Sequence, residues 1–289
     1  MDASPYPCVV HIDLHTHSRV SDGTDAPAEL MVNAARAGLD VVALTDHDTT
    51  AGWDEAAARV EATGVALVRG TEVSCTASGI SVHLLSLLQD PDHAQLRAEL
   101  ERSRVSRDSR ARLMVERIGA DLGLTWADVE AQSGDDTTIG RPHIADALVA
   151  RGYVADREEA FETILRTGSP YYVRYHAPDA VEAVRLVRAA GGVPVFAHPR
   201  ASARGRVVGR DVIEAMAAAG LAGLEVDHRD HDERARAELR LLAAELGLLV
   251  TGSSDYHGAG KPNRLGENTT SPAVLAQIEK EGLLPVVRP

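Results

Sequence analysis

Residues 9–24 read VVHIDLHTHSRVSDGT, an apolar run that changes within a few positions into a group of histidines and acids. The first part, Val9 to Ile12, is β-branched and apolar, as is typical of a buried strand. Directly after it come Asp13, His15, His17 and Asp22, whose side chains are of the types that bind metal ions. A solvated loop would explain this stretch equally well, so its interpretation depends on the residues at the ends of the other strands.

The composition is typical of a globular protein with one large domain or a domain plus an insertion: 289 residues, 44% hydrophobic and 25% charged. No apolar run approaches the roughly 20 residues of a membrane span and no leader segment is evident, so we expect a cytoplasmic protein with no membrane partner. Cys8 and Cys75 are too few for a disulfide framework or a thiolate zinc site and are expected to be small buried side chains. The net charge of -13 argues against a long nucleic-acid groove, whereas a small phosphorylated ligand is compatible with it.

Apolar runs alternate with segments of helical periodicity along most of the chain. Seven runs are predicted strands: Val9 to Ile12, Val41 to Leu44, Val65 to Val68, Ile80 to Leu88, Val193 to Phe196, Gly223 to Val226 and Leu248 to Val250. The predicted helices beside them are Pro27 to Ala37, Ala51 to Ala62, Pro178 to Ala190, Gly209 to Ala219 and Glu233 to Leu246. This alternation predicts an α/β fold built from parallel βαβ units.

The alternation stops between about Asp90 and Ala177, where one predicted helix follows another. These helices are Gln95 to Leu122, Trp126 to Ala131, Arg141 to Ala150 and Glu158 to Leu165. We therefore expect residues 1–90 and 178–289 to form an α/β domain with the metal site. Residues 91–177 are expected to form a helical insertion that contributes to substrate binding.

Histidines and carboxylates recur at or near the ends of the predicted strands. Beyond the first stretch, these residues are Asp46, His47, Glu72, His83, His198, Glu225, Asp255 and His257. Any one of them is explained more simply as a satisfied surface or core residue. Their recurrence at the same end of seven strands favours a metal site, because that end carries the active site in α/β barrels. Imidazole and carboxylate without thiolate suit zinc, manganese or iron, and this many ligands indicates more than one ion.

The motifs DLHTHSRVSDGT, TDHDT, GTEVS, AHPR and SDYH together resemble the polymerase and histidinol phosphatase (PHP) superfamily, over nearly the whole chain. The resemblance implies a distorted (β/α)7 barrel, here with an inserted helical domain, and a centre of three divalent ions. By motif position, the first ion is held by His15, His17, Glu72 and Asp255, the second by Glu72, His83 and His198, and the third by Asp22, His47 and His257. Asp13 is then expected to orient a ligand histidine from outside the ligand shell.

The helical insertion carries a second motif, TIGRPHIADALVARGYV at residues 138–154. Pro142 suits the first helical position, which leaves Gly140 and Arg141 at the N-terminus, where free amides and the helix dipole attract an anion. Taken alone, GRPH is better explained as an exposed helix cap. It also resembles the GRPHIA segment of the PHP branch that removes phosphate from nucleoside 3',5'-bisphosphates. That resemblance implies substrate binding by Gly140, Arg141 and His143, with Arg141 and His143 taking part in catalysis.

Two further groups are less informative. The segment RDSR places Arg107 and Arg110 on one helix face, which either binds phosphate or is solvated. The segment DHRDHD offers His228 and His231 beside the sixth strand, and without a partner motif we interpret both as rim residues. Whether any of these four side chains touches substrate is left open.

The predicted function is a metal-dependent phosphoesterase that removes the 3'-phosphate of nucleoside 3',5'-bisphosphates to give 5'-monophosphates. Trimming of short 5'-phosphorylated oligoribonucleotides is an extension of that activity. A cyclic-phosphate dihydrolase and a histidinol-phosphate phosphatase are the alternatives among enzymes, and a metal-stabilised binding module is the alternative outside them. Complete ligand motifs argue against the binding module, because a structural role needs no open coordination positions.

Overall fold

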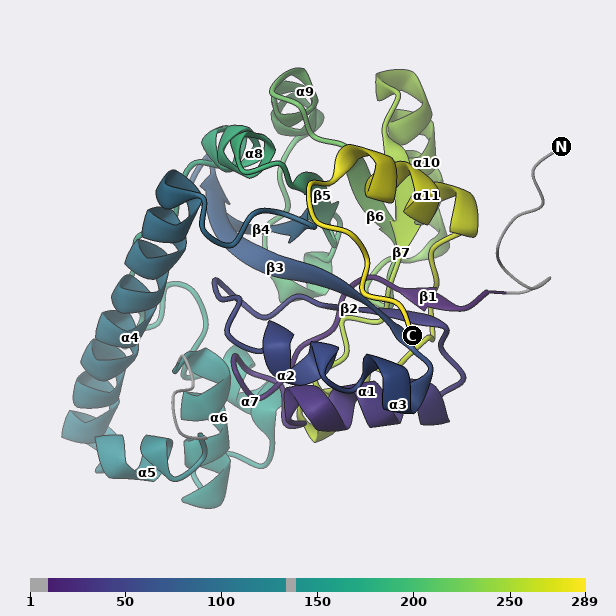
Figure 1. The fold of residues 1–289 in the computed structure, drawn as a ribbon. Coiled ribbons are helices and arrows are strands. Elements are labelled where there is room, and N and C mark those ends of the chain that lie inside the picture. The colour runs from purple at the N-terminus through teal and green to yellow at the C-terminus, as the bar shows by residue number, and fades with distance from the viewer. Residues whose placement is uncertain (1–9, 134–138) are drawn as a thin grey trace, which may run out of the picture.

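A mixed α/β architecture is seen in the computed structural model, which describes residues 10–133 and 139–289. A seven-stranded sheet, with its strands in sequence order, curves into a nearly closed barrel (Figure 1). The strands are β1 (Ile12–Asp13), β2 (Val41–Leu44), β3 (Ala66–Ala77), β4 (Ile80–Leu87), β5 (Val193–Ala197), β6 (Gly223–Asp227) and β7 (Leu249–Gly252). The expected barrel with a helical insertion is confirmed.

The fourth strand departs from the expected parallel arrangement. β4 pairs antiparallel with both β3 and β5, whereas the other neighbouring strands are parallel. The reversal follows from a tight hairpin in which Ser78 (φ 50) and Gly79 (φ 72) connect the paired residues Ala77 and Ile80. Positive φ at both central residues is typical of the type I′ turn that joins antiparallel strands. The predicted βαβ unit is therefore wrong at this point, and His83 reaches the site from the first half of its strand.

β3 is also longer than predicted. It continues through 12 residues, so Glu72 lies in the middle of the strand and not after it. Glu225 likewise lies within β6. β1 is only Ile12–Asp13, and Val9 lies outside the described residues.

Helices cover the barrel and form the insertion. Those around the barrel are α1 (Pro27–Arg36), α2 (Trp53–Ala57), α3 (Val60–Thr63), α8 (Ala180–Ala189), α9 (Arg210–Ala218), α10 (Glu233–Leu246) and α11 (Pro272–Glu281), with short 3-10 turns at Ser202–Arg204 and Gly258–Gly260. The insertion contains α4 (Ala94–Leu122), α5 (Trp126–Glu130), α6 (Arg141–Ala150) and α7 (Arg157–Glu162). In Figure 1 these insertion helices lie together on one side of the molecule.

Helix α4 belongs to two hydrophobic cores. Leu96 and Leu100, in its first two turns, pack into a barrel core with residues of β3, β4 and α8. Met114 and Ile118, farther along, pack into a separate core with residues of α6 and α7. The division of the chain at residues 90 and 177 remains a prediction.

The expectations from composition concerned the cysteines and membrane-spanning segments. Cys75 is buried, as expected, and Cys8 lies outside the described residues. Among residues 10–133 and 139–289, we find no helix with the length and apolar character that crossing a membrane requires.

Candidate metal centre

One carboxylate oxygen of Glu72 is the meeting point of three imidazoles. Glu72 Oε2 lies 3.3 Å from His15 Nε2, 3.1 Å from His17 Nε2 and 3.2 Å from His47 Nδ1. His15 and His17 follow β1, and His47 follows β2, so neighbouring parallel strands deliver them to the same end of the barrel. His15 Nε2 and His17 Nε2 are themselves only 3.0 Å apart, as two ligands of one ion would be.

The second oxygen of Glu72 faces two more histidines. Glu72 Oε1 lies 2.8 Å from His83 Nδ1 of β4 and 3.1 Å from His198 Nε2, directly after β5. Glu72 lies inside β3, which is between β2 and β4 in the sheet, so histidines from both directions can reach its carboxylate. Glu72 is thus placed to be shared between cations on either oxygen.

Asp255 and Asp22 bring two further carboxylates to the histidines. Asp255 Oδ1, after β7, is 3.5 Å from both His15 Nε2 and His17 Nε2. Asp22 Oδ1 is 3.2 Å from His257 Nε2, and its Oδ2 is 3.7 Å from His47 Nε2. Both carboxylates are almost completely buried.

The hydrogen-bonding pattern fits a metal site. His47 Nδ1, His83 Nδ1 and His257 Nε2 are buried and make no hydrogen bond within the described part of the chain, although each lies close to a carboxylate oxygen. Buried polar atoms are nearly always hydrogen-bonded, so three such nitrogens together require another partner. Divalent cations are the partners that this set of imidazole and carboxylate ligands suits.

The structure brings together all the residues that the sequence predicted as ligands. Four sets have ligand atoms within 4.8 Å of one another: His17, Asp22, His47 and His257; His15, Glu72 and His198; His15, His17 and Asp255; and His47, Glu72 and His83. These sets share members and differ in part from the expected grouping, since His17 joins the set of Asp22 and His47 joins that of Glu72 and His83. The assignment of ligands to individual ions therefore stays a prediction.

Burial keeps part of the histidine cluster in the form that binds metal. Burial lowers the pKa of His257 to about 4, with the charge of Lys261 adding to the effect. Burial also lowers the pKa of His47 well below its ordinary value, and the surrounding carboxylates only partly offset this. Both rings are neutral near pH 7, and a neutral imidazole has a lone pair for a cation.

Glu225, within β6, orients one of these ligands. Glu225 Oε1 accepts a hydrogen bond from His15 Nδ1 at 3.0 Å, which leaves His15 Nε2 facing the other ligands. Glu225 Oε2 accepts from the His198 amide at 2.7 Å. This is the usual arrangement in which an outer carboxylate fixes the tautomer of a metal-binding histidine.

Asp13 acts differently from the expectation. Its Oδ1 accepts from the Ser254 amide at 3.0 Å and from the His15 amide at 3.4 Å, and its Oδ2 accepts from the Gly266 amide at 3.0 Å. No imidazole is among these partners, so Asp13 holds the backbone of the loops after β1 and β7. Burial raises its pKa to about 6.

Two carboxylates of the TDHDT motif fix the loops that carry ligands. Asp46 accepts from Ser18 Oγ at 2.6 Å and from Ser21 Oγ at 2.7 Å. Asp48, at a left-handed φ of 54, accepts from the Ser74 amide at 2.8 Å. The sequence analysis did not single out Asp48, and the repeated acids that flank His47 were the available signal.

The N-terminus of α6 contains the GRPH motif, but its amides are partly used. The Gly140 amide donates to His143 Nδ1 at 3.0 Å. It is therefore not free to bind an anion, contrary to the expectation from the sequence. Since Nδ1 accepts this bond, a neutral His143 carries its proton on Nε2. Arg141 donates to the Leu165 carbonyl at 3.3 Å and lies over the Phe161 ring.

The predicted arginines form a cluster with aromatic rings. Arg110 donates through Nε to the Val173 carbonyl at 2.8 Å and lies against two rings, those of Tyr172 and Tyr175. Arg107 donates to Asp48 Oδ2 at 3.1 Å and also to Ser74 Oγ. Arg107 thus connects the insertion to the loop that carries His47.

His228 and His231 are not rim residues, which corrects the sequence interpretation. Both are buried, His228 completely. His231 Nδ1 contacts the Val226 carbonyl at 2.9 Å, and its Nε2 accepts from the Arg200 amide at 3.1 Å, which gives it a structural role. His228 Nε2 lies 3.5 Å from Asp255 Oδ2, and Lys261 Nζ lies 3.1 Å from the same oxygen.

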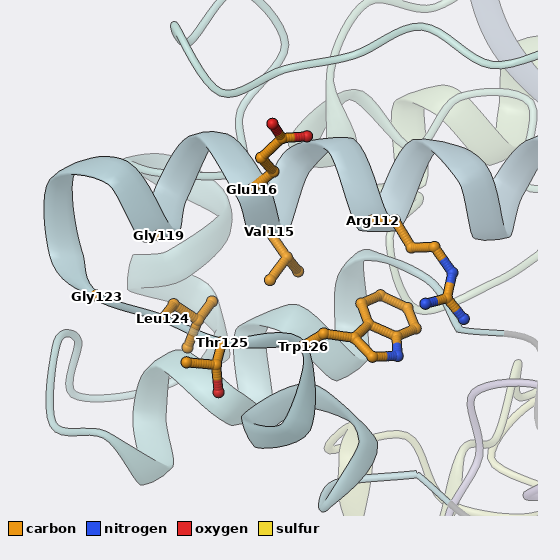
Figure 2. Close-up of a pocket in the computed structure, with 8 residues that line it drawn as sticks. All are labelled: Arg112, Val115, Glu116, Gly119, Gly123, Leu124, Thr125 and Trp126. Atoms are coloured by element: carbon orange, nitrogen blue, oxygen red, sulfur yellow. The ribbon is translucent and has the colours of Figure 1, made fainter.

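A separate pocket lies away from this centre. It has a volume of about 360 Å³ and is formed by α4 and the start of α5 (Figure 2). Figure 2 shows Val115 pointing toward Leu124 and Trp126, whereas Glu116 points away from them. None of the predicted site residues lines it.

Comparison with known proteins agrees with this geometry. Residues 13–106 match the family model of the PHP domain. The 3',5'-nucleoside bisphosphate phosphatase of Chromobacterium violaceum is 34% identical, over 97% of this chain and 99% of its own. A 5'-3' exoribonuclease of Haemophilus influenzae is 32% identical, over 89% and 93% of the two chains.

Among solved structures, a protein of Bifidobacterium adolescentis to which metal-dependent phosphoesterase activity is provisionally ascribed superposes with a TM-score of 0.91. It is 43% identical, over 96% of this chain and 98% of that one. The similarity extends over the barrel and the insertion, and the family model covers the first ligand motifs. The chain therefore belongs to the PHP-domain family of metal-dependent phosphoesterases.

Proposed function

We propose that this phosphoesterase removes the 3'-phosphate of nucleoside 3',5'-bisphosphates and releases the 5'-monophosphate. The observation that carries the proposal is a pair of guanidinium groups, those of the buried Arg110 and the partly buried Arg141, which have backbone and aromatic partners but no carboxylate partner among the described residues. Burial and the neighbouring Arg141 lower the pKa of Arg110 to about 10. Burial and the charge of Arg107 also lower the pKa of Arg141. An anion between the two would offset both effects, and a phosphate matches the forked donors of arginine.

This cationic cluster adjoins the metal ligands. Arg107 binds Asp48, the neighbour of His47, and its charge acts on Arg110 and Arg141. A substrate with two phosphates suits a centre with two anion-binding parts, because one phosphate lies at the metal ligands while the arginines hold the other. The similarity to the Chromobacterium violaceum bisphosphate phosphatase supports this choice.

The metal ligands would hold three divalent ions, and their nitrogen and oxygen donors favour manganese, iron or zinc. When bound, such ions supply Lewis-acid catalysis and activate water for attack on phosphorus. The protein's own part is to fix the substrate. The Nε2–H of His143 is available to donate to a phosphate oxygen, and Arg141 orients the second phosphate.

Trimming of short 5'-phosphorylated oligoribonucleotides is the second activity that we propose. A site that holds a 5'-phosphate and cleaves at the adjacent 3'-phosphoester would accept the first nucleotide of a short RNA. The similarity to the exoribonuclease of Haemophilus influenzae favours this extension. The net charge of -13 limits it to short strands.

A substrate panel on metal-loaded protein tests the proposal. The panel contains adenosine 3',5'-bisphosphate, a ribose cyclic phosphate, histidinol phosphate and a 5'-phosphorylated trinucleotide, and chromatography identifies the products. We expect the highest kcat/KM on the bisphosphate, with 5'-AMP as product. Release of the 5'-phosphate, or faster hydrolysis of the cyclic phosphate or histidinol phosphate, would replace this function with the corresponding alternative.

A further inference from the structure

The two oxygens of Asp255 have different surroundings. Oδ1 faces the imidazoles, at 3.5 Å from His15 Nε2, His17 Nε2 and His257 Nδ1. Oδ2 faces the side chains of His228 and Lys261. Asp255 also has a left-handed φ of 54, which sets the direction of its side chain. One oxygen is thus turned to the ligand cluster and the other to a pair of nitrogen donors.

The tautomer of His228 follows from its other nitrogen. His228 Nδ1 accepts a hydrogen bond from the Asp230 amide at 3.0 Å. The proton of the neutral ring is therefore on Nε2, the atom that lies 3.5 Å from Asp255 Oδ2. This buried Nε2 makes no hydrogen bond with any residue in the described ranges.

His228 is not placed to be a metal ligand itself. Its lone pair is on Nδ1, which the Asp230 amide occupies. Its Nε2 also falls outside the sets of clustered ligand atoms found among the described residues. A fully buried histidine with a donor aimed at a ligand carboxylate is instead suited to orienting that carboxylate.

We infer that His228 is a positioning residue that, together with Lys261, holds Oδ2 of Asp255 so that only Oδ1 is presented to the metal ions. The inference rests on the proposed binding of metal by Asp255, and it concerns metal affinity more than the choice of substrate. Outer partners of metal ligands typically contribute about 10- to 100-fold in affinity or activity. Loss of the Nε2 donor should therefore weaken metal binding by that factor.

Two amide substitutions separate this role from a purely structural one. In His228→Asn, the amide oxygen takes the place of Nδ1 and keeps the bond from the Asp230 amide, but no donor reaches Asp255. In His228→Gln, the amide nitrogen takes the place of Nε2 and keeps the donor to Asp255. A structural role predicts that Asn is tolerated and Gln is harmful, whereas the positioning role predicts the opposite.

The experiment uses cobalt(II) as the probe, without nucleotide. Metal-free wild type and both variants are titrated with cobalt, with the visible absorption spectrum and competition by a chelator as readouts. We expect about 10- to 100-fold weaker cobalt binding and an altered spectrum in His228→Asn, with recovery in His228→Gln. Wild-type affinity in His228→Asn, or equal losses in both variants, would overturn the inference.

Folding and function are checked separately. Thermal unfolding of the metal-free proteins shows whether each variant folds, and if His228→Asn does not, His228→Leu and His228→Gln form a second pair. Both of these lack the acceptor for the Asp230 amide and differ in the donor. If wild type fails to hydrolyse the bisphosphate while the cobalt result holds, the proposed substrate is wrong and the role of His228 stands.

Discussion

The barrel and the helical insertion each bring several polar side chains close together, but the two clusters suit ligands of opposite charge. In the barrel, imidazole nitrogens and carboxylate oxygens converge around Glu72, and several nitrogens lack hydrogen bonds. In the insertion, burial and the nearby guanidinium of Arg141 lower the pKa of Arg110 to about 10. The first arrangement needs cations and the second needs an anion. Divalent ions would complete the first, and in the proposed function a phosphate of the substrate would complete the second.

Removal of metal should have the largest effect, because the whole barrel centre depends on it. We expect prolonged chelation to abolish phosphatase activity and added manganese, iron or zinc to restore it. The measurement is phosphate release, with elemental analysis of the same samples. Full activity in protein shown to be free of metal would mean that the barrel centre does not work through bound cations.

Substitution of Glu72 should come next. Glu72→Gln removes the charge that the surrounding imidazoles share, and we expect metal content and activity to fall together. The loss should exceed the about 10- to 100-fold that is typical of an outer partner of a metal ligand. Elemental analysis and kcat/KM measure the two effects.

The control for that variant is Glu99→Gln, which alters another buried carboxylate, one that contacts His176 outside the metal centre. It should keep its metal. Circular dichroism should show that the helices persist in both variants. Unchanged metal stoichiometry in Glu72→Gln would exclude Glu72 as a ligand.

Substitution of Arg141 tests the insertion in the same way. If Arg141 binds phosphate by charge-assisted hydrogen bonds, Arg141→Ala should cost about 1.5 to 3 kcal/mol, or roughly 10- to 150-fold in kcat/KM for the bisphosphate. Metal content should stay unchanged. Activity on a small generic phosphodiester should fall much less, since that substrate makes little use of remote binding energy.

Arg151, at the other end of α6, provides the matched control. It is exposed and paired with Asp128 at 2.9 Å, so Arg151→Ala should leave bisphosphate hydrolysis unchanged. Equal losses on both substrates for Arg141→Ala, or similar losses for both arginines, would mean that Arg141 does not recognise the nucleotide.

The smallest effect should come from that same surface pair. Hydrogen bonds from Thr125, and then the contact with Arg151, lower the pKa of Asp128 to about 2. A carboxyl group with a lowered pKa stabilises the fold above about pH 4, and this contribution is lost as the pH falls toward 2. In Arg151→Ala the pKa should rise only part of the way, because Thr125 remains. An NMR titration of the carboxylate measures it, and a full return to the ordinary value would assign the whole shift to Arg151.

Local signals made the helices and the ligands predictable. The predicted helices Arg141 to Ala150 and Glu233 to Leu246 match the structure, because each has its capping signals in the sequence beside it. All the predicted ligands meet because they follow or lie in neighbouring strands of one barrel. Helix α11 was missed, although Ser271 caps it and Pro272 begins it.

Tertiary contacts decided what the sequence analysis missed. The reversal of β4 depends on a turn at Ser78 and Gly79 that was not recognised. The approach of buried His228 to Asp255 joins residues after β6 and β7 that are distant in sequence, and no local pattern indicates it. The pairing of Arg107 with Asp48 likewise joins segments 59 residues apart.

The continuity of α4 limits how the insertion can move. This helix of 29 residues has its first turns in the barrel core and its later turns in the insertion core. It contains no proline, and its one glycine, Gly119, comes after Arg107 and Arg110. Sharp helix kinks nearly always need such residues or an inserted group. The continuous helix therefore links the two cores directly, so a hinge within α4 is disfavoured and Arg107 and Arg110 are carried on the same helix that packs into the barrel.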